Sequence, residues 1–287
     1  MRIVLGSAQF GLNYGITNNV GKVKSQEVRK ILSYARENNI NTLDTAIEYG
    51  DSEASLGMAN ISNWRVVTKL PVIPKKTNNI PEWIDQQINS SLLRLKIPKL
   101  DGLLLHNPID LLSKNGNEIW KTIQIKKNEG LVKKIGFSIY SPNELELLWS
   151  SYRPDIVQVP FNILDRRIKT SGWLQKLNEN NVEVHSRSIF LQGLLLMNPI
   201  ERSKLFYKWQ SIWSVLDTWL INNNISPIEA ALGFVFSEKN IDCVIVGVES
   251  KNQLNEIISI SNSSFNLKLP ESLSTVDLDL IEPVNWI

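Results

Sequence analysis

The sequence contains very little cysteine and histidine. Cys243 is its single cysteine, so a disulfide within the chain and a metal cage of thiolates are both excluded. This cysteine lies in the apolar run Asp242–Val246, where a buried strand residue without chemistry is the expected interpretation. There are only two histidines, with no carboxylates clustered beside them in the sequence, and we therefore predict no catalytic metal site.

An excess of charge and a long apolar run are also absent. Lys and Arg number 31 against 29 Asp and Glu, a balance that favours neither nucleic acid nor an anionic membrane as a partner. No run approaches the ~20 apolar residues of a membrane span, and Met1–Ala8 lacks the features of a secretory signal. We therefore expect a cytoplasmic protein that acts on a small molecule. Its oligomeric state cannot be predicted from these features.

Short apolar runs recur along the chain and are continuous rather than alternating, which is typical of strands buried on both faces of a parallel sheet. Segments with helical spacing separate them, and no change in composition marks a domain boundary. We therefore predict one domain over residues 1–287 with an α/β fold, a (β/α)8 TIM barrel of parallel strands. The expected strands are Ile3–Leu5, Thr42–Leu43, Val66–Thr68, Gly102–Leu105, Lys134–Phe137, Ile156–Val159, Val182–Val184 and Cys243–Val246.

Two segments lie outside this alternation. Extra helices are predicted over Leu205–Asn222 and Pro227–Glu238, between the seventh and eighth strands, and the tryptophans of the first helix are expected to pack in the core. The tail, residues 262–287, is polar and without clear periodicity. We expect it to cross the surface, with Trp286 able to fold back over the barrel mouth.

Four polar residues, Asp44, Tyr49, Lys69 and His106, follow three of the predicted strands. A parallel barrel gathers the carboxyl ends of its strands at one mouth, so these side chains are expected to share a site. A phenol with a pKa near ~10 becomes an effective proton donor when a cation stabilises its phenolate, the role predicted for Lys69. Asp44 would keep Lys69 charged, and His106 would hydrogen-bond and orient the substrate oxygen.

Proton donation alone cannot reduce a carbonyl group, because its carbon must also gain a hydride. Protein side chains supply no hydride, so a nicotinamide cofactor is implied. Each of the four residues also has an ordinary structural interpretation as a turn, packing or surface residue. Their joint position at successive strand ends favours the catalytic interpretation.

In three segments the chain resembles the aldo-keto reductase family: Asn41–Ala46 with Tyr49–Gly50, Thr68–Lys69, and Leu103–Pro108. The resemblance extends from Leu5 to Leu254. It implies a (β/α)8 barrel, binding of NADPH without a Rossmann domain, reversible reduction of aldehydes or ketones, and a catalytic set of Asp, Tyr, Lys and His at the four positions named above.

The same resemblance implies a set of cofactor contacts. Ile139 stands where the family usually has Asn, Arg187 where an aromatic residue faces the nicotinamide, and Gln253 where many members have Arg. Glu249 adds a negative charge, for which Lys251 can compensate. The resemblance implies NADPH, while NADH stays open. The implied contacts are Ser138, Gln158, Arg187, Ser188, Phe190, Gln192, Gly193, Gly247, Ser250, Gln253 and Glu256.

Two other functions are compatible with these residues. One is a non-catalytic barrel that senses the redox state of a nicotinamide cofactor. The other is a lyase that forms a Schiff base on Lys69, which pairing with Asp44 disfavours because a protonated lysine is a poor nucleophile. The pocket loops fit a sugar-like carbonyl and an aromatic aldehyde equally well. His185 is either a cofactor contact or a residue satisfied within the barrel rim.

Overall fold

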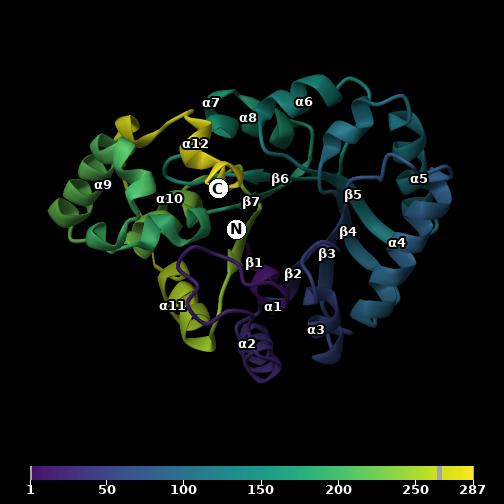
Figure 1. Ribbon diagram of the computed structural model, residues 1–287, viewed down its shortest axis with the longest axis horizontal. Coiled ribbons are helices and arrows are strands. Elements are labelled where there is room, and N and C mark those ends of the chain that lie inside the picture. The colour runs from purple at the N-terminus through teal and green to yellow at the C-terminus, as the bar shows by residue number, and fades with distance from the viewer. Residues whose placement is uncertain (1, 264–266, 287) are drawn as a thin grey trace.

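A computed structural model describes residues 2–263 and 267–286. Eight parallel strands form a closed barrel in sequence order, with β8 paired to β1, and helices surround it (Figure 1). The predicted (β/α)8 barrel is therefore confirmed, and each expected apolar run lies in or overlaps a strand. The strands are β1 (Arg2–Gly6), β2 (Thr42–Asp44), β3 (Arg65–Leu70), β4 (Leu100–Leu105), β5 (Val132–Ser138), β6 (Ile156–Pro160), β7 (Glu183–Arg187) and β8 (Cys243–Gly247).

The main helices follow the strands in turn, and two of them begin with a full capping box. Ser141 and Ser226 each form a capping box with a glutamate three residues later, and proline follows each serine. These helices are α2 (Ser25–Glu37), α3 (Ser52–Met58), α4 (Ile80–Leu95), α5 (Gly116–Asn128), α6 (Pro142–Leu148), α8 (Trp173–Glu179), α10 (Pro227–Phe236) and α11 (Lys251–Ser261); short helices are α1 (Ala8–Gly11) and α7 (Arg167–Thr170). No helix of the described residues is long and apolar enough to cross a membrane.

The predicted helix Leu205–Asn222 is divided in two. A 3-10 helix, Lys204–Trp209, precedes α9 (Gln210–Asn223), and the second predicted helix ends at Phe236 rather than Glu238. The main core joins the strands to the helices around them, and a second core cluster lies apart from it. Trp209 and Trp213 are buried in this second cluster together with Leu216, so the core-packing prediction for the tryptophans is confirmed.

The predicted surface course of the tail is confirmed for most of the described residues after 266, which are at least partly exposed, but three of them are buried. A 3-10 helix, Glu271–Leu273, and α12 (Leu278–Ile281) bury Leu273, Leu280 and Ile281 in the second core cluster. Trp286 packs edge-on against Phe206 rather than over the barrel mouth, and its indole N–H donates to the Leu280 carbonyl at 3.2 Å. The partners of these buried tail residues lie far away in sequence, so periodicity along the tail could not reveal the contacts. Residues 264–266 and 287 of the predicted tail lie outside the described residues.

Candidate active site

A cavity of about 540 Å³ opens at the carboxyl ends of the strands. The structure brings nearly all the predicted site residues to it. Asp44, Tyr49 and His106 line the cavity, and so do all the predicted cofactor contacts except Ser250, which caps α11. Lys69 does not line it, because its side chain is buried beneath.

Lys69 and Asp44 form an ion pair at the cavity floor, where Asp44 faces the cavity and Lys69 lies beneath it. The Lys69 Nζ lies 2.7 Å from Asp44 Oδ2 and donates to the Thr45 carbonyl at 2.8 Å, and the Lys69 side chain has no exposed surface. The other carboxylate oxygen, Asp44 Oδ1, accepts a hydrogen bond from Gln158 Nε2 at 2.7 Å. Burial lowers the pKa of Lys69, and Asp44 opposes that shift by favouring the ammonium form.

Tyr49 lies beside this ion pair. The Lys69 ammonium is 4.9 Å from the centre of the phenol ring, but its hydrogen bonds go to Asp44 and Thr45. Burial, followed by the charge of Asp44, raises the pKa of Tyr49, and Arg187 is the cation that opposes the rise. Burial is the larger of the two causes, so the phenol of the free protein has a raised pKa although an ammonium lies beside its ring.

His106 stacks edge-on against Tyr49, with 5.8 Å between the ring centres. Burial, together with the charges of Lys69 and Arg187, lowers the pKa of His106 to about 3, so the imidazole is neutral. Its Nδ1 lies 2.7 Å from Glu48 Oε2. A carboxylate only accepts, so Nδ1 carries the proton and Nε2 is left as an acceptor. Sequence reasoning missed Glu48, whose one signal is its place directly before Tyr49.

Arg187 ends β7 and is fixed in the cavity wall. Its guanidinium lies 4.6 Å from the centre of the Tyr140 ring and donates to the Ile139 carbonyl at 3.0 Å and to Ser188 Oγ at 3.1 Å. Ile139, which replaces the family's usual asparagine, thus contributes its backbone to hold Arg187. Tyr140 was not predicted as a site residue.

The other end of the cavity has the features of a nucleotide cradle. A Cβ on Gly247 would lie 2.6 Å from the Gln9 amide, so glycine lets backbone and amide approach closely there. The buried Gln9 Oε1 has no hydrogen-bond partner among the described residues. Beside them begins α11, whose first N–H groups favour an anion. These residues, with Ser138 and Gln158 at the barrel end, fit a nicotinamide dinucleotide.

Carboxylates surround the start of α11. The Lys251 N–H donates to Glu27 Oε1 at 2.9 Å, and Glu249 and Glu256 line the cavity nearby. The Glu249 N–H donates to Gln253 Oε1 at 2.7 Å. Two backbone N–H groups at this end are therefore already engaged, one of them by a carboxylate.

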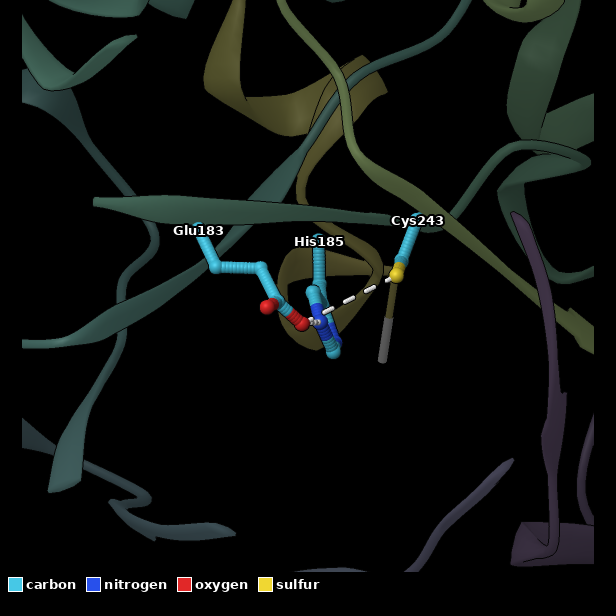
Figure 2. A group of neighbouring side chains, drawn as sticks. All are labelled: Glu183, His185 and Cys243. Atoms are coloured by element: carbon cyan, nitrogen blue, oxygen red, sulfur yellow. Dashed lines mark hydrogen bonds and ion pairs between the residues drawn. The ribbon is translucent and has the colours of Figure 1, made fainter. Parts of the chain in front are cut away.

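The second histidine lies at the opposite end of the barrel. Figure 2 shows His185 pointing toward Glu183 and Cys243 inside the barrel, and His185 Nε2 lies 2.8 Å from Glu183 Oε1. Contrary to the sequence interpretation, a carboxylate thus lies beside this histidine, and the three potential ligand atoms lie within 4.8 Å of one another. Glu183 also forms ion pairs with Lys134 and Arg2.

We interpret this group as a buried ion cluster, since a divalent cation would have to compete with two basic side chains for the same carboxylate. Burial disfavours the charged imidazole, but hydrogen bonds with Cys243 and Glu183 outweigh it and raise the pKa of His185 to about 9. His185 does not line the cavity, so it is not placed to contact a cofactor there; Glu183 engages its Nε2, while its buried Nδ1 has no hydrogen-bond partner among the described residues.

Comparison with known proteins agrees with this barrel and its site at the mouth. The model of the Aldo/keto reductase family matches residues 2–273, and the chain belongs to that family. It is therefore an oxidoreductase of small carbonyl compounds.

Similar curated proteins are oxidoreductases. The chain is 26% identical over 254 residues to an uncharacterized oxidoreductase, YqkF, of Bacillus subtilis, covering 81% of each chain. It is 28% identical over 238 residues to the NAD/NADP-dependent indole-3-acetaldehyde reductase of Schizosaccharomyces pombe, covering 75% of this chain and 79% of that one. In fold it is similar to the holo form of an aldo-keto reductase from Bacillus halodurans, with a TM-score of 0.73 and 19% identity over 95% of this chain and 89% of that chain.

Proposed function

We propose that this protein reduces an aldehyde or ketone to an alcohol with a reduced nicotinamide cofactor, and that Tyr49 donates the proton. The observation that carries the proposal is the convergence of Tyr49 and His106 in one cavity directly above the buried Asp44–Lys69 ion pair. Strand ends from β2, β3 and β4 supply this set, as the sequence predicted for a catalytic constellation.

A bound reduced nicotinamide supplies the hydride that the carbonyl carbon gains. As negative charge develops on the carbonyl oxygen, the Tyr49 hydroxyl transfers its proton to that oxygen, and solvent later returns a proton to the phenolate. The raised pKa of Tyr49 keeps the hydroxyl protonated at neutral pH, and an alkoxide is basic enough to take its proton. The charges of Lys69 and Arg187 stabilise the phenolate that remains.

His106 and Glu48 form the polar wall beside Tyr49. With Nδ1 donating to Glu48, the Nε2 of His106 accepts a hydrogen bond, and the hydroxyl of an alcohol product is a suitable donor. In this arrangement His106 orients the oxygen-bearing group of the ligand without becoming charged.

The residues around the start of α11 bear on whether the protein uses NADPH or NADH. The family resemblance implies NADPH, but Glu27, Glu249 and Glu256 place negative charge where a 2′-phosphate would add more. A neutral 2′-hydroxyl meets no such repulsion, so we propose that NADH also serves and that the carboxylates weaken the preference for NADPH.

A screen of cofactor oxidation tests this function. Purified protein is mixed with NADPH or NADH and a panel of aldehydes, ketones and keto-sugars, and Tyr49→Phe is the matched control. Turnover by the native protein and its loss in the variant support the proposal. Cofactor binding without turnover of any carbonyl would instead favour the redox-sensing alternative.

The lyase alternative has a separate test. Borohydride would trap a Schiff base on Lys69, but this amine has no exposed surface and donates to both Asp44 and Thr45. We expect no covalent adduct by mass spectrometry.

A further inference from the structure

Arg187 is a cation without a carboxylate partner in the cavity wall. In residues 2–263 and 267–286 it forms no ion pair, and its hydrogen bonds go to neutral oxygens of Ile139 and Ser188. Its Nε is buried and has no hydrogen-bond partner in the same residues. The other charged groups that line the cavity are acidic, and among them Asp44 and Glu48 are engaged by Lys69 and His106.

A partly buried guanidinium in this position favours an anion. Charge-assisted hydrogen bonds between guanidinium and carboxylate or phosphate groups are among the stronger polar interactions in proteins. Tyr140 covers one face of the guanidinium, and the Ile139 carbonyl holds one of its nitrogens, so the group is preorganised and loses little freedom on binding.

The anion is more reasonably part of the substrate than of the cofactor. Arg187 shares the barrel end of the cavity with Tyr49 and His106, where the reacting carbonyl would lie, while the helix start that favours phosphate is at α11. The nicotinamide ring carries no negative charge, and it is cationic when oxidised. With a neutral substrate no anion would contact the Arg187 guanidinium beside that ring, and the Glu144 carboxylate, which feels its charge, forms no ion pair with it.

We propose that Arg187 binds an anionic group of the substrate, so that this protein reduces carbonyl compounds that carry a carboxylate or a phosphate a short distance from the carbonyl. The inference rests on the proposed function and adds the class of substrate to it. It also gives a physical reason for arginine at a position where the family usually has an aromatic residue.

Substrates matched in length test the proposal. Succinic semialdehyde is compared with butanal, which lacks the carboxylate, and glyceraldehyde 3-phosphate with glyceraldehyde, which lacks the phosphate. In one of the two pairs, the native protein should have a much larger kcat/KM for the anionic substrate than for its neutral partner. That pair shows whether the anion is a carboxylate or a phosphate. Arg187→Gln should lower kcat/KM for that anionic substrate by about 10- to 100-fold and change the neutral partner much less.

Arg153→Gln is the matched control. The Arg153 guanidinium also stacks on an aromatic ring, 4.2 Å from the centre of Trp149, but it does not line the cavity. This variant should keep the native ratio. Equal kcat/KM for anionic and neutral substrates in the native protein would overturn the proposal. So would an equal loss for both in Arg187→Gln with a matching loss of cofactor affinity, because Arg187 would then serve the cofactor.

A binding measurement separates failure of this proposal from failure of the proposed function. Calorimetry with 4-hydroxybutyrate, with glycerol 3-phosphate and with butanol, in the presence of oxidised cofactor, needs no turnover. Binding of one anion to the native protein but not to Arg187→Gln supports the anion site even if no carbonyl is reduced. Failure of both anions to bind the native protein any better than butanol overturns it.

Discussion

Lys69 and Asp44 lie 2.7 Å apart, with 0% and 4% of their side chains exposed, and thus form a buried ion pair beneath the cavity. Such a pair is held in place by its neighbours: Thr45 accepts from the ammonium, and Gln158 donates to the carboxylate. Removing one partner leaves a charge without compensation in a site from which water is excluded.

We therefore expect Lys69→Met to lower the free energy of unfolding by roughly 3–5 kcal/mol. Urea denaturation followed by circular dichroism measures the change. Lys208→Met is the matched control, because the Lys208–Asp279 pair is on the surface and its removal should have little effect. Equal stability of the two variants would show that the buried pair contributes no more than a surface one.

Tyr49→Phe removes the proposed proton donor and leaves the ring packed against His106. We expect cofactor affinity to be retained and kcat for carbonyl reduction to fall by roughly 10²- to 10⁴-fold, the usual contribution of a positioned acid. Fluorescence titration and steady-state kinetics measure the two quantities. Full activity of the variant would refute the assignment of Tyr49.

The raised pKa of Tyr49 predicts opposite pH dependences for the two directions of the reaction. Reduction needs the protonated phenol, which predominates at every pH below that pKa, so its rate should be flat from about pH 6 to 9. Alcohol oxidation needs the phenolate, whose fraction rises about tenfold per pH unit in this range. Rate profiles in both directions check this prediction. A reduction rate that already falls steeply as the pH rises from 6 to 9 would contradict it.

Glu27→Gln removes a negative charge at the start of α11 while keeping an oxygen that can accept from the Lys251 N–H. We expect the affinity for NADPH to rise several-fold relative to that for NADH, since only NADPH carries the phosphate that the carboxylate repels. Dissociation constants at low and high salt measure the effect. Glu37→Gln at the other end of α2 is the control, and an unchanged ratio in both variants would rule out this role for Glu27.

His185 predicts a loss of stability at alkaline pH. Its pKa is raised from 6.5 to about 9 in the folded chain, so protonated His185 stabilises the fold fully below about pH 6.5, and this contribution is lost as pH rises through 9. The free energy of unfolding should fall between these values, and His185→Gln should flatten the decline. An identical decline in native protein and variant would assign it to other groups.

The sequence predicted those parts of the molecule that depend on position along a strand. Continuous apolar runs indicated the strands, and polar residues at their carboxyl ends, such as Asp44 and His106, therefore lie at one mouth. These predictions succeed because closure of a parallel barrel determines which chain ends meet.

Side-chain pairings between distant elements could not be predicted in this way. Glu48 binding to His106 and Glu27 binding to the start of α11 depend on rotamers and on how helices lie against the barrel. The opposing effect of Asp44 on the acidity of Tyr49 likewise depends on three-dimensional distances and on burial. Spacing along the chain contains none of this information.

The buried contacts of the final segment have a practical consequence for producing the protein. Leu273, Leu280 and Trp286 pack into the same apolar cluster as α9, so shortening the chain before residue 273 would uncover that cluster and promote aggregation. The other terminus tolerates additions better, because Arg2 begins β1 at the barrel end remote from the cavity and its side chain is half exposed. An affinity tag for purification therefore belongs ahead of β1.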